Sequence, residues 1–174
     1  MRTILIALAL AVGASAQQPD QNQPFDVNGV QLGSAFSDWQ KGPGAKCTYF
    51  MDVEPDVASY RCPDLVYAGV QVQETVSFYH GRLINFYLVA SHKDFASLRA
   101  AMKEKFGQPW RTEQKVYSLN GITLTGEHNR WSNGTTSLNL AEFSPDRDHT
   151  LLFFSNVEVM ADKTKSAKAK AGGL

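Results

Sequence analysis

The side chains best suited to acid–base or metal chemistry are four histidines in separate segments of the chain: His80, His92, His128 and His149. An imidazole titrates near neutral pH and is a common metal ligand. If the segments carrying His128 and His149 pair as strands, their rings and Asp148 would form one metal-binding group. Nothing in the spacing requires that pairing, so histidines at the surface or in turns are the simpler interpretation.

Motifs of known catalytic classes are absent from the sequence. It contains no G-x-S-x-G turn, no H-E-x-x-H, no phosphate-binding P-loop and no C-x-x-C pair. We therefore expect no cofactor, no metal and no catalytic residue. The alternative is a small metal-dependent or hydrolytic enzyme that uses His128, His149 and a carboxylate such as Glu74 or Asp148.

One carboxylate, Glu74, falls on the apolar side of a predicted hairpin. Alternating apolar residues predict strands over residues 70–79 and 84–88. We expect a three-residue turn, Tyr79-His80-Gly81, which places Glu74 opposite Phe86. Glu74 then marks a bulge or a sheet edge, or it is a functional buried carboxylate with a raised pKa.

Residues 1–16 have the form of a signal peptide. A short basic start, Met1-Arg2, precedes an apolar run over residues 4–12, and Ala14-Ser15-Ala16 has the small-x-small pattern of a cleavage site. The run is too short to span a bilayer. We expect an exported protein, periplasmic or extracellular, without stable membrane insertion.

Cys47 and Cys62 are the only two cysteines, and we expect them to form a disulfide in an oxidising compartment. The closed loop is worth about 3 kcal/mol in the chain-entropy model. Its acidic residues lack the glycine and the terminal glutamate of a calcium loop, so no ion site is predicted there.

The outward face of the predicted sheet carries the candidate binding residues. Tyr79 and Tyr87 point outward on one hairpin, and four polar residues share the outward face of another: His128, Arg130, Ser137 and Asn139. Tyr, Arg and amide side chains suit a protein partner. An ordinary solvated sheet face explains the same pattern.

Two helices and several strands are expected to position these residues. Ser34 is the predicted N-cap of a helix that ends at Gly42-Pro43, and a second helix follows Ser91 and ends at Gly107. Apolar residues on the second helix recur at helical spacing and predict one buried side.

The last third of the chain predicts strands only. Asn120-Gly121 and Asn133-Gly134 are both two-residue hairpin signals; the second pairs Trp131 with Thr136. The apolar sets of the two hairpins fall on opposite parities, so we expect a bulge at Gly126. Residues 149–157 are apolar on both parities, which predicts a strand covered on both sides. Asn133 also begins a glycosylation sequon.

Helix then strands, twice over, predicts an α+β fold: an antiparallel sheet with two main helices on one face, in two loosely similar halves. We expect a flexible lead over 17–26 and one domain over 27–160, with halves of about 27–90 and 91–160.

Residues 161–174 contain four lysines among Ala, Ser and Gly, and predict a disordered tail. Residues 17–160 carry 12 Lys and Arg against 16 Asp and Glu.

Several local patterns resemble those of small exported bacterial proteins of unassigned function. They are Leu32-Gly33 opening a helix, the turn at Phe78–Leu83, the helix end Lys105–Pro109, and Trp131 before a strand of alternating leucines. The helix-then-strands plan also resembles the beta-lactamase inhibitor protein and the small lipoprotein of the outer-membrane assembly machine. The lipoprotein cysteine is missing here. The resemblance implies a protein-binding sheet face.

The favoured hypothesis is an exported, non-enzymatic protein that binds another exported or envelope protein through its sheet face. A carrier of a small apolar ligand, held between helices and sheet, is a further alternative. No nucleic-acid partner is expected.

Overall fold

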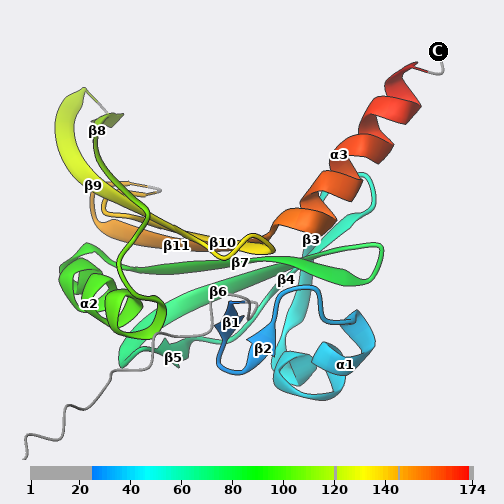
Figure 1. The fold of residues 1–174 in the computed structure, drawn as a ribbon. Helices are drawn as coiled ribbons and strands as arrows, with labels where there is room; N and C mark the ends of the chain where they lie inside the picture. Colours follow the sequence, from blue (N-terminus) through cyan, green and yellow to red (C-terminus); the bar gives the residue numbers. More distant parts are fainter. Residues whose placement is uncertain (1–24, 120, 145, 173–174) are drawn as a thin grey trace, which may run out of the picture.

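The computed structural model describes residues 25–119, 121–144 and 146–172. The fold is α+β, as predicted: an antiparallel sheet carries two helices, α1 and α2, on one face (Figure 1). The predicted signal peptide and nearly all of the predicted flexible lead lie outside the described residues. The end of that lead differs from the prediction, because Phe25 is buried and its N–H donates to Thr136 Oγ1 (3.0 Å).

Helices and short 3-10 turns alternate with the strands along the chain. The helical elements are α1 (Phe36–Lys41), a 3-10 turn (Pro43–Lys46), a second 3-10 turn (His92–Asp94), α2 (Phe95–Phe106) and α3 (Val157–Gly172). The strands are β1 (Asp26–Val27), β2 (Val30–Gln31), β3 (Thr48–Glu54), β4 (Val57–Arg61), β5 (Leu65–Tyr67), β6 (Val70–Tyr79), β7 (Arg82–Ser91), β8 (Arg111–Leu119), β9 (Ile122–Ser132), β10 (Thr136–Ala141) and β11 (His149–Asn156).

The main sheet has the order β3-β4-β6-β7-β11-β10-β9-β8, and β5 pairs beside it with β6. In each half, a helix is followed by four strands of the main sheet, and each of these strands pairs with the next one. The last strands of the two halves, β7 and β11, pair with each other in the middle of the sheet. The two central strands therefore come from different halves of the chain.

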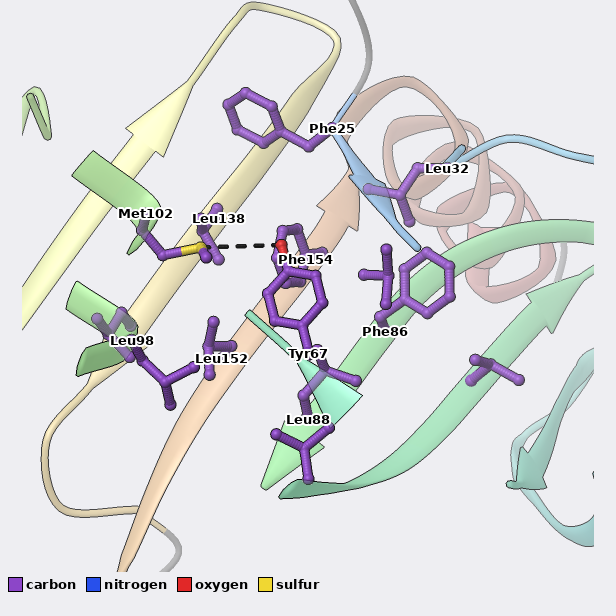
Figure 2. Close-up of a cluster of buried hydrophobic side chains, with 14 of the residues drawn as sticks. Phe25, Leu32, Tyr67, Phe86, Leu88, Leu98, Met102, Leu138, Leu152 and Phe154 are labelled. Atoms are coloured by element: carbon purple, nitrogen blue, oxygen red, sulfur yellow. Dashed lines mark hydrogen bonds between the residues drawn. The ribbon is translucent and has the colours of Figure 1, made fainter. Parts of the chain in front are cut away.

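One face of the sheet packs against α1, α2, the β1–β2 hairpin and β5, and we call it the covered face (Figure 1). Its core includes Leu138, Leu152 and Phe154, all fully buried, beneath Leu98 and Met102 of α2. Figure 2 shows these side chains converging, with the Tyr67 hydroxyl donating to the Met102 sulfur. The predicted apolar side of α2 is thus the side that makes the core.

The β6–β7 hairpin differs from the predicted register. Its turn contains only His80 and Gly81, both with positive φ (47° and 72°), as a tight hairpin turn requires. A register shift beside Ser77 then takes up one extra residue of β7, so Glu74 pairs with Leu88 rather than with Phe86. Glu74 still lies on the core side, as expected, and is 9% exposed.

The β8–β9 hairpin has its predicted register, with Leu119 opposite Ile122. The predicted bulge at Gly126 is wrong, because the pairing runs through it without a shift. Gly126 instead leaves room for an aromatic ring: a Cβ there would lie 2.5 Å from Phe143. Ile122, at the tip of this hairpin, is 43% exposed. The apolar residues of the tip therefore lie outside the core, and no bulge is needed to turn them toward it.

The Asn133 turn also differs from its prediction. Trp131 pairs with Leu138, not Thr136, and the loop is two residues longer on the β10 side. The Asn133 side-chain oxygen accepts hydrogen bonds from the N–H groups of Thr135 and Thr136 (3.2 and 2.8 Å). This local capping stabilises a wider loop than the Asn-Gly pair alone predicts.

The predicted N-cap of α1 is wrong, whereas that of the second helical segment is confirmed. Ala35 occupies the cap of α1, and the Ser34 hydroxyl donates backward to the Gln31 carbonyl (2.7 Å). Ser91 caps the 3-10 turn that leads into α2 by accepting from the Lys93 N–H. Gly107 ends α2 with a positive φ.

Residues 161–172 are helical, not disordered as predicted. Asn156 caps α3 by accepting from the Val159 N–H (2.9 Å), and Val159 is buried against Tyr79 and Ile84. An anchored first turn removes the nucleation cost, and alanine and lysine then propagate a helix well. α3 rises from the face opposite α1 and α2 (Figure 1).

The Cys47–Cys62 disulfide is present, as predicted. It joins the residue before β3 to the residue after β4, so it fastens the base of the β3–β4 hairpin. The chain-entropy model assigns such a loop about 3 kcal/mol.

Candidate functional site

The sheet face opposite α1 and α2 is covered where α3 begins and, on the β8–β9 hairpin, by the Phe143 ring beside Gly126 and Tyr117. We call the rest of it the open face. Cross-strand pairing arranges its side chains in three rows. The first row is Gln73, Val89, Leu151, Ala141, His128 and Glu113; the second is Arg61, Thr75, Tyr87, Phe153, Asn139, Arg130 and Arg111; the third is Ser59, Ser77, Asn85, Ser155, Ser137 and Ser132.

The centre of the open face is apolar. Val89, Tyr87, Leu151 and Phe153 lie on the two middle strands and are each only partly buried. The Tyr87 and Phe153 rings meet edge to face, with centroids 6.3 Å apart. The prediction that residues 149–157 are covered on both sides is therefore wrong. Only the β11 residues that point to the covered face, such as Leu152 and Phe154, are packed beneath helices.

Guanidinium groups stand at both ends of the second row. On the β4 side, Arg61 lies over the Phe50 ring at 4.0 Å from its centroid. On the other side, Arg130 and Arg111 both reach Glu113, at 2.9 and 2.7 Å. The aromatic pair is thus flanked by positive charge along one line across the sheet.

The third row consists mainly of hydroxyl groups that bond to one another. Ser59 and Ser77 are 2.8 Å apart, and Ser137 and Ser155 are 2.7 Å apart. Because the side chains of this row are short, the sheet surface is shallower here than at the apolar centre on one side or at α3 on the other.

Glu113 is the negative centre of the β8–β9 ribbon. Burial alone would raise the pKa of its carboxyl, but Arg111, Arg130 and Lys115 together hold the pKa below its usual range. Glu113 therefore stays ionised and orients the two arginines.

His128 is nearly buried beside Glu113, with 13% of its side chain exposed. Burial lowers its pKa to about 4, and the positive charges of Lys115 and Arg130 act in the same direction. The ring is neutral at physiological pH, so it adds a polar group to the site but no charge.

The structure brings together five of the six predicted binding residues. Tyr87, His128, Arg130, Ser137 and Asn139 all lie on the open face. Tyr79 lies on the same side of the sheet but is only 6% exposed, because α3 covers it. It is therefore not a surface residue, contrary to the prediction.

Sequence analysis missed Phe153, Leu151, Arg61, Arg111 and Glu113 as members of this face. The signal for the first two was present, since β11 is apolar on both parities. It was assigned to a second covering layer instead of an exposed surface. The predicted β8–β9 register places Arg111 opposite Arg130, whereas Arg61 joins the face only through the strand order.

The residues of the alternative enzyme hypothesis do not converge. β10 lies between the strands that carry His128 and His149, and Glu74 lies on the covered face. His149 bonds instead to Asp146, at 2.7 Å. Across the described residues, no three His, Cys, Asp or Glu side chains are grouped as metal ligands would be.

Burial favours the protonated, uncharged form of the Glu74 carboxyl. Desolvation raises the pKa of its carboxyl to about 7. Its flanking residues on the same face, Val72 and Val76, are buried core residues. Glu74 is a buried carboxylate within the hydrophobic layer, on the face away from the open-face residues.

A hollow of about 390 Å³ lies where α3 begins, lined mainly by polar residues that include Arg82, Asn156 and Glu158. Its position differs from the space between helices and sheet in which a carried apolar ligand is expected. Within the described ranges, no helix has the length and apolar character needed to cross a membrane.

Comparison with known proteins places the chain in no family. No protein-family model matches it, and no curated protein does. A cysteine-rich secretory protein from Staphylococcus aureus is similar in structure, with a TM-score of 0.45 and 11% identity over 80% of this chain. The match covers 49% of that protein, so this chain spans about half of its length.

Proposed function

We propose that this chain is an exported, non-enzymatic protein that binds another protein through its open face. The observation that carries the proposal is the apolar centre on the two middle strands, where Leu151 and Phe153 are partly exposed. Middle strands are the most deeply placed part of a sheet, and apolar residues there are normally covered. A partner would supply the missing layer.

The composition of the open face fits a protein partner. Protein interfaces combine aromatic and arginine anchors with a polar rim. Here the Tyr87–Phe153 pair forms the centre, Arg61 and Arg130 flank it, and the hydroxyl row forms one border. The strands hold these side chains in place before binding, which reduces the entropy lost on association.

Export is part of the same proposal. Residues 1–16 have the pattern of a signal peptide, and the disulfide suits an oxidising space. The partner is then another exported or envelope protein, in the periplasm or outside the cell.

Affinity capture from the exported fraction of the producing cell tests the proposal. We expect the protein to retain a stoichiometric partner, and we expect the double variant Tyr87→Ser/Phe153→Ser to lose it while keeping its fold. The matched control is Tyr49→Ser/Val116→Ser, which changes two exposed apolar residues off the open face (57% and 72% exposed). Equal loss in both variants, or retention in the first, contradicts the proposal.

A further inference from the structure

The β8–β9 ribbon concentrates positive charge around one carboxylate. Arg111, Lys115 and Arg130 approach Glu113 at 2.7, 3.7 and 2.9 Å, and His128 Nδ1 lies 3.7 Å from the same carboxylate. We call these five residues the cationic cluster. Because His128 is neutral, three positive charges lie near two carboxylates, Glu113 and Glu142, both of which act on Tyr117, and the region keeps a net positive charge.

Three buried polar atoms lie in or next to this cluster without a hydrogen-bond partner. They are Arg130 Nε, His128 Nδ1 and Tyr117 Oη, and no other buried side-chain atom of the described residues is in this condition. Pairing places Glu113 opposite His128 and Arg111 opposite Arg130, so both residues share a face with Glu113; Tyr117 follows on the same side of β8.

Unpartnered buried polar atoms are rare, because leaving one unsatisfied costs free energy. These three atoms are covered by the chain itself, so a partner meets instead the exposed parts of Arg111, Lys115 and Arg130, whose side chains are 52%, 41% and 30% exposed. Glu113 accepts from Arg130 Nη2 and Arg111 Nη2, but not from Arg130 Nε or Tyr117 Oη. The exposed positive groups, in excess over the two carboxylates, select an anion.

We propose that the cationic cluster binds a carboxylate side chain of the partner protein; this rests on the proposed protein-binding function. A carboxylate accepts two parallel bonds from a guanidinium, which suits Arg130. Arg130 and Phe153 share a row and are separated by one strand, so the partner presents its carboxylate about 10 Å from the apolar residue that covers Phe153.

An NMR titration of the purified protein with sodium propionate tests the carboxylate site without the partner. The Nε–Hε signal of Arg130 should shift and saturate in the millimolar range, and the same ionic strength of sodium chloride should not reproduce the shift. Arg130→Gln removes the signal and assigns it. In Arg111→Gln, the half-saturation concentration should rise several-fold.

Arg82→Gln is the control variant, because Arg82 is exposed at the start of β7, away from the β8–β9 ribbon. It should leave the Arg130 response unchanged. A response that does not saturate at Arg130, or that is equal at Arg82, overturns the proposal. A stronger response to inorganic phosphate than to propionate overturns its assignment to a carboxylate.

Affinity capture separates this inference from the proposed function. If both hold, Arg130→Gln weakens partner capture at least tenfold, as Tyr87→Ser/Phe153→Ser also does. If Arg130→Gln captures the partner as well as the original protein, the carboxylate contact is refuted while the protein-binding face stands. If propionate binds but no variant affects capture, the protein-binding face is refuted.

Discussion

The two faces of the sheet are built from the same strands and differ in what covers them. On β11, Leu152 and Phe154 are fully buried beneath the helices, whereas Leu151 and Phe153, which alternate with them in sequence, are partly exposed. The residue types are the same on both parities. The difference lies in the covering layer: α1, α2, β1–β2 and β5 on one side, and on the other the start of α3 and the Phe143 ring at the β8–β9 hairpin.

This contrast separates stability from binding. The covered face removes large apolar side chains from water and supplies most of the hydrophobic stabilisation. The open face keeps its apolar centre in contact with solvent, where those residues stabilise the fold weakly. The proposed partner would cover these residues at the centre of the sheet.

The largest expected effect comes from adjacent phenylalanines that point to opposite faces. Phe154→Ala should lower the free energy of unfolding by about 3–5 kcal/mol, because it opens a cavity in a packed core. Phe153→Ala should lower it by about 1 kcal/mol, since little buried area is lost. Urea unfolding of both variants measures the difference. Equal losses would show that the open face is packed as tightly as the covered one.

The disulfide should contribute next. Cys47→Ser/Cys62→Ser should lower the free energy of unfolding by about 2–4 kcal/mol, by freeing the loop of the unfolded chain. Partner capture should remain, because both cysteines lie outside the open face. Thiol titration of the unfolded, unreduced protein checks the bridge. Two free thiols per chain, or loss of capture in a folded double variant, would contradict this.

The buried titratable group of the covered face is Glu74. Its pKa is raised from 4.5 to about 7, so the folded state holds a proton that the unfolded state releases. Its contribution to stability is complete below about pH 4.5 and is lost as pH rises through 7. Glu74→Gln should therefore add about 2 kcal/mol at pH 8 and little at pH 4, in urea unfolding at both values.

His128, near the open face, should respond to pH in the opposite direction. Its pKa is lowered from 6.5 to about 4, so between these pH values the imidazole is protonated in the unfolded state and neutral in the folded state. Stability is complete above about pH 6.5 and is lost as pH falls through 4. In His128→Gln, the loss between pH 7 and pH 4 should be smaller by about 1 kcal/mol. An unchanged pH profile would place His128 in solvent.

Local patterns predicted the elements well where local sequence determines them. The alternation on β6 and the apolar side of α2 gave the core side correctly, including the position of Glu74. The β6–β7 register was wrong, because a positive φ at His80 and an extra residue near Ser77 have no single-residue signature.

The candidate site was predictable only in part. Period-two alternation placed Tyr87, Arg130 and Asn139 outward, because parity is a local property. The predicted β8–β9 register already placed Arg111 opposite Arg130, whereas the meeting of Phe153 with Tyr87 depends on the long-range pairing of β11 with β7 and could not be derived. The burial of Tyr79 depended on α3, whose sequence of lysine and alanine gave no sign of its anchor at Val159.

Photo-crosslinking at Phe153 tests the central claim most directly. Phe153→p-benzoyl-phenylalanine places a reactive ketone at the centre of the open face, and Tyr49→p-benzoyl-phenylalanine places one on exposed β3 as a control. After irradiation of the producing cells, position 153 should yield one discrete crosslinked protein, which Tyr87→Ser abolishes, and position 49 should not yield it. Absence of a crosslink at 153, or the same product from both positions, would contradict a protein-binding open face.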